Sequence, residues 1–263
     1  MSEKVGYWSQ NKYYRLNVKD YVEGFCGWKP LKELIGYAES GRNQSFMACC
    51  FLTGGRVSEV LALKHQNFDV REAERVIIVR NMKLVKRYKK LSETVDSEGK
   101  KHWITRKLLT TRKVFPISTL EPLTPIVLEW LDKIGPKTEE EKARMDDILL
   151  FPSPYKIGFP LTRFWAYKLI RNLDKNISED LQEQLGLNKP FWKEGRKISD
   201  VLHLWLHWFR SQRASQLVSD YGYEVIDLVD FFSWEKGDTA LVYARKGWKG
   251  LASKMLAAQV NYV

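Results

Sequence analysis

Three separated segments of the chain carry residue types that can act on a phosphate ester. The first reads Thr-Gly-Gly-Arg-Val-Ser-Glu, and its two glycines allow a tight turn that directs Arg56 away from the core. The second places His207 and Arg210 three residues apart, hence on one face of a predicted helix. The third ends at Tyr243, nine residues after Trp234. Together they supply guanidinium groups for a phosphate, an imidazole for proton transfer and a phenol that can act as a nucleophile.

Each segment taken alone has an ordinary structural explanation. Many helices begin after glycine with a surface arginine, and a tyrosine on a short amphipathic helix is usually a core or surface residue. Most histidines in apolar helices are hydrogen-bonded core residues. His207 differs because it shares its helix face with Arg210, which has no reason to be buried without an anion. The chemistry therefore depends on the fold bringing the three segments together.

Composition restricts the class of protein. With 263 residues, 44% of them hydrophobic, the chain can bury a large core, and its net charge of +11 favours a polyanionic partner. The alternative is a soluble basic protein with no such partner. The cysteines Cys26, Cys49 and Cys50 have no zinc-ligand spacing and fit a reducing compartment. No run is apolar enough to span a membrane, so we expect a cytoplasmic protein that needs neither metal nor cofactor.

The order of predicted elements indicates an α+β fold, mostly helical with a small antiparallel sheet. The β-branched run 75–81 predicts a strand that pairs with residues 112–118. Between them, the basic segment 83–111 is too long for a tight hairpin. We expect an extended β-hairpin there, or a loop with its own ribbon, with part of it as solvated loop. Apolar spacing predicts helices over residues 30–40, 43–52, 57–66, 122–135, 162–176, 200–220, 225–232, 238–246 and 248–259, with an inserted excursion at 177–197.

Together, these segments resemble the tyrosine recombinase family, which includes phage integrases, Xer recombinases and Cre. Residues 46–70 look like the family's first arginine box, T-G-x-R-x-S-E-x-x-x-L. The sequence His-Trp-Phe-Arg is similar to the H-x-L-R box, with Phe209 in place of leucine. Residues 233–243 resemble the final box, in which His or Trp stands nine residues before the tyrosine. The resemblance covers residues 30–246 and implies the mostly helical catalytic domain of that family.

The resemblance implies a role for each matching residue. Tyr243 would attack a DNA phosphodiester, and Arg56 and Arg210 would stabilise the charge of the pentacovalent transition state. His207 would donate to the phosphate and help to deprotonate the tyrosine, while Trp234 would offer an indole N–H donor and packing area. The resulting 3′-phosphotyrosyl link conserves bond energy, so the strand can be rejoined without a metal or nucleotide cofactor.

The family also uses a lysine on the sheet to protonate the leaving 5′-oxygen, and Lys83 matches that position best. Lys86, Lys89, Lys90 and Lys113 lie near enough to remain alternatives. The acidic residue of the first box, Glu59, would brace a side chain of the active site. We assign five further basic residues to DNA binding: Lys86, Arg87, Lys89, Lys90 and Arg213.

We expect three parts in the chain: an N-terminal segment 1–29 without a complete core-binding domain, the catalytic domain 30–246, and a helical tail 247–263. The chain would be a minimal recombinase, a catalytic fragment, or a protein whose partner supplies the second half of a DNA clamp. The tail would dock into a neighbouring protomer or pack on its own domain. The expected partners are double-stranded DNA, further copies of the chain forming a dimer to tetramer on DNA, and an accessory DNA-binding protein.

Two other functions compete with site-specific recombination. A type IB topoisomerase uses similar chemistry to relax supercoils without joining two duplexes. The helix expected after Tyr243 and the small size of the chain favour recombination over this alternative. A DNA-binding regulator with a decayed active site is the second alternative, and the complete set of candidate catalytic residues argues against it.

Overall fold

The computed structural model describes residues 24–80, 82–95, 97–98, 101–111, 115–143, 148–188, 191–193, 196–199, 203–234 and 237–244. Most of the predicted N-terminal segment, the predicted tail 247–263 and Lys113 lie outside the described residues. The described chain is mostly helical with small antiparallel sheets, which confirms the predicted α+β class. Among the described residues, no helix combines the length and apolar character needed to cross a bilayer.

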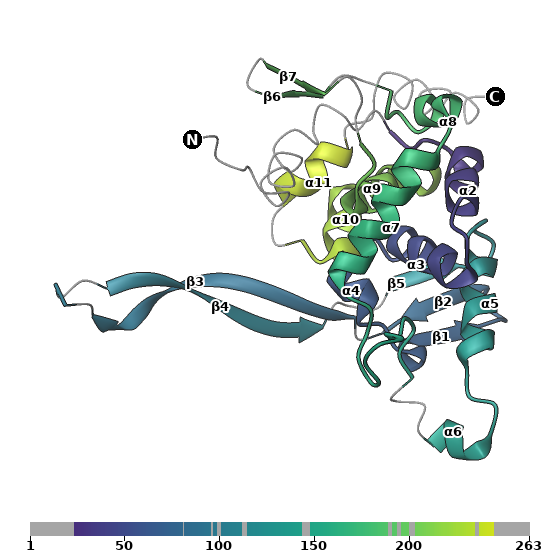
Figure 1. The fold of residues 1–263 in the computed structure, drawn as a ribbon, viewed down its shortest axis with the longest axis horizontal. Coiled ribbons are helices and arrows are strands. Elements are labelled where there is room, and N and C mark those ends of the chain that lie inside the picture. Colours follow the sequence, from purple (N-terminus) through teal and green to yellow (C-terminus); the bar gives the residue numbers. More distant parts are fainter. Residues whose placement is uncertain are drawn as a thin grey trace, which may run out of the picture.

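The predicted helices and strands occur in the predicted order along the chain (Figure 1). Five elements were not predicted: the strands Phe68–Arg71, Phe191–Lys193 and Arg196–Ser199 and the helices Glu139–Ala143 and Glu179–Gln184. The helices are α2 (Trp28–Gly36), α3 (Gly41–Leu52), α4 (Val57–Leu61), α5 (Thr124–Ile134), α6 (Glu139–Ala143), α7 (Arg163–Asn176), α8 (Glu179–Gln184), α9 (Leu206–Tyr221), α10 (Val225–Phe232) and α11 (Gly237–Ala244), with a 3-10 turn, η1 (His65–Asn67). The strands are β1 (Phe68–Arg71), β2 (Val76–Val79), β3 (Lys83–Val95), β4 (Lys101–Thr111), β5 (Phe115–Ser118), β6 (Phe191–Lys193) and β7 (Arg196–Ser199).

A three-stranded antiparallel sheet has the order β1-β2-β5. Ile77 of β2 stands opposite Ile117 of β5, and both side chains are buried. This register confirms the predicted pairing of segments 75–81 and 112–118. Successive side chains of a strand point to opposite faces of the sheet. The pairing therefore places the buried side chains of β2 and β5 in one apolar row, on the face that packs against the helices.

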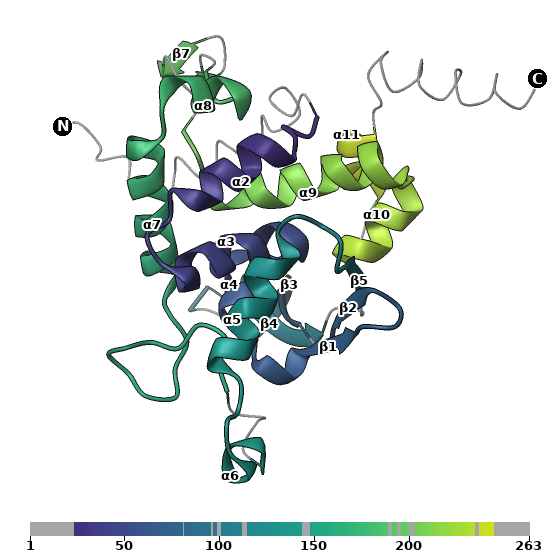
Figure 2. The ribbon, with the colours of Figure 1, turned by 90° about the vertical axis from the view of Figure 1, so that its right-hand side faces the viewer.

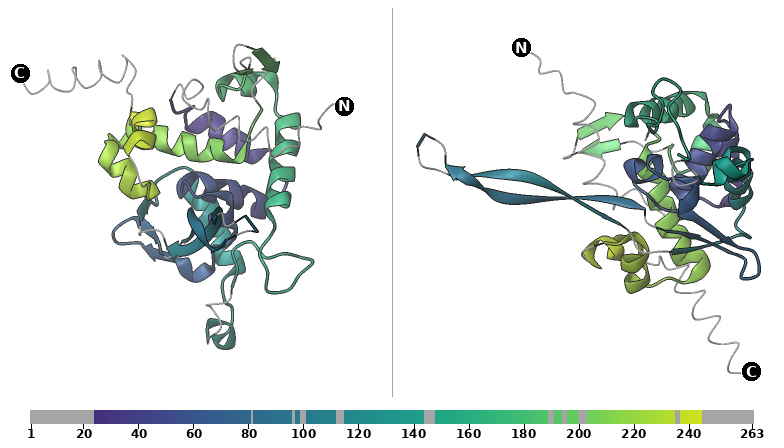
Figure 3. Two further views of the ribbon diagram at one scale, coloured as in Figure 1. Left: turned by 90° about the vertical axis from the view of Figure 1, so that its left-hand side faces the viewer. Right: turned by 90° about the horizontal axis from the view of Figure 1, so that it is seen from below.

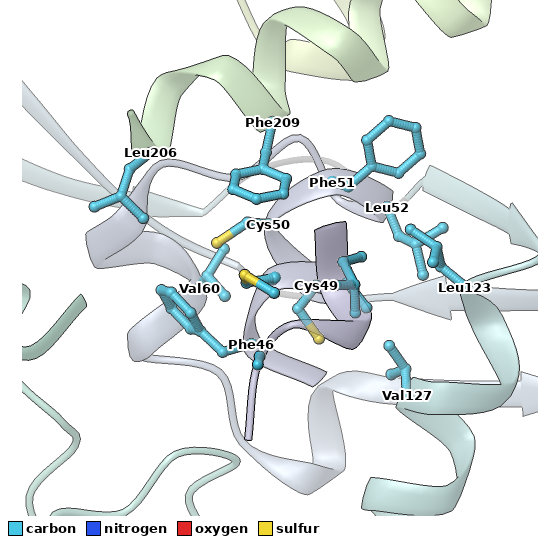
Figure 4. Close-up of a cluster of buried hydrophobic side chains, with 14 of the residues drawn as sticks. Phe46, Cys49, Cys50, Phe51, Leu52, Val60, Leu123, Val127, Leu206 and Phe209 are labelled. Atoms are coloured by element: carbon cyan, nitrogen blue, oxygen red, sulfur yellow. The ribbon is translucent and has the colours of Figure 1, made fainter. Parts of the chain in front are cut away.

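The hydrophobic core is built around α3, which is buried from Ser45 to Leu52. Phe46 packs edge-to-face against Phe151, and Cys49 and Cys50 are almost fully buried. Figure 4 shows side chains from α3, α4, α5 and α9 gathered around these cysteines. A helix that is apolar on all sides lies inside a domain, so α3 is the element on which the others are assembled.

The basic segment between β2 and β5 forms the predicted extended hairpin. Strands β3 and β4 pair in antiparallel register, from Lys83 opposite Thr111 to Val95 opposite Lys101, with an irregularity between Leu91 and Val95. Figure 1 shows the hairpin leaving the body next to α4, and the right-hand view of Figure 3 shows it extending well away from the helices.

Helix α9 crosses the body beside α3, and α10 and α11 gather at one end of it (Figure 2). Helix α9 ends at Tyr221, and the following Gly222 has a φ of 70°, the left-handed conformation common after a helix. Residues of α9, α10 and α11 form a second buried cluster, separate from the core around α3: Ala214, Leu217, Val218, Leu228, Phe231, Phe232, Ala240 and Tyr243.

Three local predictions need correction. The helix predicted over residues 200–220 begins at Leu206, because the backbone of the preceding Trp205 is extended. The helix predicted over residues 57–66 ends at Leu61, because the chain turns there so that Lys64 can form a β-bridge with Leu149. The segment assigned as 1–29 also overlaps the folded body, since Phe25 and Trp28 pack on the core. The backbone N–H of Cys26 donates to the Gln212 side chain at 2.8 Å, so the compact part of the described chain begins before residue 30.

Candidate active site

The turn that follows α3 is held by the side chain of Thr53. Its hydroxyl donates to the Cys49 carbonyl at 2.6 Å, and its oxygen accepts from the Gly55 N–H at 3.0 Å. Both bonds are buried, so they survive without competition from water. The threonine therefore connects the end of α3 to the glycine pair and fixes the position of Arg56.

Gly54 meets two requirements that other residues would not meet. Its φ is +54°, and a Cβ at this position would lie 2.2 Å from the Phe232 ring. Glycine adopts such a φ without strain, and its lack of a side chain lets the turn lie directly against α10. The first box therefore packs on the helix that precedes Trp234.

Arg56 caps the start of α4, and Glu59 lies in the first turn of that helix. The carboxylate of Glu59 accepts from the Arg56 backbone N–H and from its guanidinium, both at 2.9 Å. Glu59 is buried, whereas 44% of the Arg56 side chain is exposed. The carboxylate thus orients a guanidinium whose outer part faces solvent, as a bracing residue would; its effect on catalysis stays a prediction.

Arg210 lies on α9 and is 2% exposed. Its guanidinium donates to the carbonyl oxygen of Gly54 and, at 3.3 Å, to that of Phe232. The group also lies over the rings of Phe232 and Trp234, at 4.5 and 5.4 Å from their centroids. Carbonyl oxygens accept from a guanidinium and ring faces attract it, so these contacts fix its orientation. Arg210 thus connects the glycine turn, α9 and the end of α10.

Tyr243 is brought to this arginine by α11. Its ring stacks on Trp234, with centroids 5.6 Å apart and an angle of 14°, and Trp234 in turn stacks on Phe232 at 4.5 Å. The phenol oxygen lies 3.2 Å from Ser211 Oγ in a buried contact. Trp234 and Tyr243, nine residues apart in the sequence, are therefore in direct ring contact.

The environment of Tyr243 alters its acidity in two opposing ways. Burial raises the pKa of the phenol above its ordinary value of 10.0, whereas the hydrogen bond between Tyr243 and Ser211 and the charge of Arg210 lower it. Burial is the larger effect. A phenol held in this way is protonated at neutral pH, so it needs a base or a nearby positive charge before it can attack.

His207 lies in the first turn of α9 and its side chain is exposed. Its backbone carbonyl accepts from Ser211 Oγ at 3.2 Å, which places Ser211 between His207 and Tyr243. The imidazole is therefore at the solvent side of the helix end that also carries Arg210. This position suits a group that exchanges protons with solvent or substrate.

The structure describes the backbone of Lys83 but not its side chain, and the same holds for Lys86, Arg87, Lys89 and Lys90. Lys83 is the first residue of β3, and the preceding Met82 is buried. A Cβ on Gly55 would lie 3.0 Å from the Met82 methyl group, so β3 begins beside the glycine turn. The choice among the lysines stays a prediction.

The predicted DNA contact of Arg213 is wrong for the conformation described. Arg213 is 1% exposed, and it donates at 2.8 Å to both carboxylate oxygens of Glu121. It also lies 5.5 Å from the ring centroids of Phe51 and Phe231. A guanidinium enclosed by a carboxylate and two rings cannot reach a phosphate, so its role is structural.

Several participants were not predicted from the sequence. The carbonyls of Gly54 and Phe232 hold Arg210, and the Ser211 hydroxyl meets Tyr243. Ser211 directly follows Arg210 and stands four residues after His207, and this spacing is the signal in the sequence that could have placed it beside the second box. Among the described residues, there is no group of three or more His, Cys, Asp or Glu side chains that could hold a metal.

No protein-family model matches the chain, and no curated protein matches its sequence. Solved structures do match. XerA recombinase is 17% identical with a TM-score of 0.48, over 89% of this chain and 63% of that one. The Tn1549 transposon integrase in complex with circular intermediate DNA is 15% identical, with a TM-score of 0.49, over 88% and 63%.

A third similar structure is XerH site-specific recombinase bound to its difH substrate, 16% identical with a TM-score of 0.46, over 86% of this chain and 50% of that one. The chain thus spans between half and about two thirds of the length of these structures. All three are recombinases or integrases.

Proposed function

We propose that this chain is the catalytic region of a tyrosine-type site-specific DNA recombinase that cleaves and rejoins strands through a 3′-phosphotyrosyl intermediate. The observation that carries the proposal is the meeting of all three boxes at one point. Arg210 of the second box binds the Gly54 carbonyl of the first box and lies over Trp234 of the third, which stacks on Tyr243.

The arrangement supports a division of labour for the phosphoryl transfer. Arg56 and Arg210 would donate to the non-bridging oxygens as charge grows on them, which is where fixed donors have the largest effect. His207 would accept the phenol proton, and a lysine of the β3–β4 hairpin, Lys83 in our assignment, would protonate the leaving 5′-oxygen. Trp234 would hold the tyrosine ring against the arginine.

Access to Arg210 requires a change in this arrangement. The guanidinium is 2% exposed and Tyr243 is 9% exposed, so neither can meet a phosphodiester where it stands. We infer that DNA binding shifts the stacked rings of Trp234 and Tyr243 relative to Arg210 far enough to admit a phosphate, while the Tyr243 oxygen stays beside Ser211. The basic hairpin, with Lys86, Arg87, Lys89 and Lys90 on β3, is the proposed DNA-binding arm.

The test is covalent trapping on DNA of randomised sequence. The probe is a pool of nicked duplexes in which the short 5′-hydroxyl fragment dissociates after attack, so that the protein–DNA link accumulates. The wild-type chain should form a denaturant-resistant adduct, and sequencing of the trapped DNA would give the target site. Tyr243→Phe should abolish the adduct while DNA binding is retained, because only the nucleophilic oxygen is removed.

Tyr223→Phe is the matched control, since Tyr223 is a partly buried tyrosine in the same cluster. It should trap DNA as the wild type does. An adduct that persists in Tyr243→Phe would show that the nucleophile is wrongly assigned. Efficient relaxation of a supercoiled plasmid that lacks the selected site would instead support the topoisomerase alternative.

A further inference from the structure

Ser211 occupies a place at the site that no box of the sequence assigns. It follows Arg210 directly and stands one helical turn after His207, so its side chain lies on the same side of α9 as the histidine. The residue is 1% exposed. A buried serine in a helix needs a partner for its hydroxyl, and here it has two.

The two partners of Ser211 Oγ are the His207 carbonyl and the Tyr243 phenol, each at 3.2 Å. A serine hydroxyl has one proton and two lone pairs, and the carbonyl can only accept. While the phenol is neutral, Ser211 can donate to the carbonyl and the phenol can donate to Ser211. When the phenol oxygen becomes negative, the serine hydroxyl can rotate and donate to that oxygen instead.

The other described neighbours of the phenol are a cation and apolar side chains. Arg210 on α9 is the charged group that favours the phenolate. From α10, the residues that share the buried cluster with Tyr243 are Leu228, Phe231 and Phe232, which carry no charge. Because burial disfavours the phenolate, each hydrogen-bond donor that remains next to the oxygen has a large effect on it.

We propose that Ser211 is a catalytic residue of this site, which holds the Tyr243 hydroxyl in the resting protein and donates a hydrogen bond to the tyrosine oxygen whenever that oxygen carries negative charge. The inference rests on the proposed function and deepens it. In cleavage, the bond from Tyr243 Oη to phosphorus forms, the bond from phosphorus to O5′ breaks, the phenol proton passes to His207, and the leaving 5′-oxygen takes a proton from the general acid.

In rejoining, the 5′-hydroxyl loses its proton to that same group and attacks phosphorus, the bond from phosphorus to Tyr243 Oη breaks, and the phenolate takes its proton back from His207. Ser211 would stabilise the phenolate in both directions, as microscopic reversibility requires. Removal of its hydroxyl should therefore slow cleavage and rejoining alike, by about tenfold or more, the usual effect of one hydrogen bond to a charged group.

The first experiment needs no DNA. A fluorinated tyrosine, whose phenol titrates nearer neutrality, is incorporated at position 243, and its fluorine NMR signal is followed against pH. Ser211→Ala should raise the titration midpoint by about one to two pH units, since the phenolate loses a donor. Ser211→Thr retains a hydroxyl and should restore the midpoint. Ser215→Ala, a buried serine one turn further along α9, is the control and should leave it unchanged.

The second experiment measures the single-turnover rate of adduct formation across pH on the DNA selected above. In Ser211→Ala the rate should fall most at lower pH and approach the wild-type rate as pH rises. A purely structural serine would lower the melting temperature and scale the rate equally at all pH values. An unchanged midpoint in Ser211→Ala would overturn the inference even if the wild type traps DNA. If the midpoint shifts but the wild type traps no DNA, the hydroxyl contact stands, and both the catalytic role and the proposed function fail.

Discussion

Arg210 and Arg213 lie one turn apart on α9, and both are almost fully buried, yet their surroundings differ in kind. Arg210 donates to two backbone carbonyls, those of Gly54 and Phe232, which carry no net charge. Arg213 donates to both oxygens of the Glu121 carboxylate, which neutralises it. Both guanidinium groups lie near aromatic rings, so ring contact alone does not distinguish them.

The difference teaches how one helix can carry both a structural arginine and the arginine that we propose to be catalytic. Backbone carbonyls hold the Arg210 guanidinium against the glycine turn and the end of α10, whereas the Glu121 carboxylate neutralises the charge of Arg213 within the fold. The Arg213 pair also joins α9 to the segment before α5, and Tyr221 donates to the same carboxylate at 2.7 Å. Arg213 therefore fixes the helix on which Arg210 has to be positioned.

The largest expected effect is on stability, from breaking the buried pair. Arg213→Met leaves the Glu121 carboxylate buried without its cation, so the free energy of unfolding should fall by about 3–5 kcal/mol. The double variant Arg213→Met with Glu121→Gln removes both charges and should recover most of that loss. Urea denaturation measures both values.

The exposed pair of Arg71 with Glu74 provides the control for this comparison. Arg71→Met should change the free energy of unfolding by less than about 1 kcal/mol, because water screens that pair. If Arg213→Met were equally mild, or if the double variant were no more stable than the single one, Arg213 would not be the structural member of the two arginines.

The next effect is on the reaction rather than on the fold. Arg210→Lys keeps a positive charge but loses the planar fork that can donate to two oxygens at once. The single-turnover rate of adduct formation should fall by about 10²–10³-fold, the usual consequence of losing one fixed donor to a developing oxyanion. The double variant at Glu121 and Arg213 should react at nearly the wild-type rate per folded molecule. Equal losses of rate in the two variants would contradict the division between the arginines.

Sequence alone was enough where the evidence is local. The β-branched run around Ile77 and the run around Ile117 each predict a strand, because strand preference depends on neighbouring residues. The glycines of the first box likewise predict a tight turn, which Gly54 adopts. These signals lie within a few consecutive residues, so they can be interpreted without knowledge of the tertiary structure.

Sequence could not separate the two arginines on α9, because their partners are distant along the chain. Glu121 lies 92 residues from Arg213, and Gly54 lies 156 residues from Arg210. Arg213 looked like one more basic residue of a DNA-binding protein, and only the buried carboxylate identifies it as structural. The contact between Ser211 and Tyr243, 32 residues apart, was missed for the same reason.

The smallest expected effect tests the outer part of the Arg213 network, through Tyr221. Burial and the neighbouring Glu121 raise the pKa of the Tyr221 phenol above its ordinary value of 10.0. Because the folded protein holds this proton more tightly than the unfolded chain, the contribution of Tyr221 to stability is fully present below pH 10 and declines as pH rises above it. Near neutral pH, Tyr221→Phe should lower the free energy of unfolding by less than about 1.5 kcal/mol, since Tyr221 is 48% exposed and water competes for its hydroxyl.

The difference between wild type and Tyr221→Phe should therefore narrow as pH is raised from 8 to 11, roughly across the ordinary pKa of tyrosine, which urea denaturation at a series of pH values can follow. The adduct rate at neutral pH should not change, because Tyr221 touches the carboxylate of the structural arginine and not the site of Arg210. A difference in stability that widened with pH would mean that the phenol ionises more easily in the folded protein, and that the charge of Arg213 rather than that of Glu121 dominates around it. In that case Arg213 would retain part of its positive charge despite its carboxylate, and its contrast with Arg210 would be one of degree.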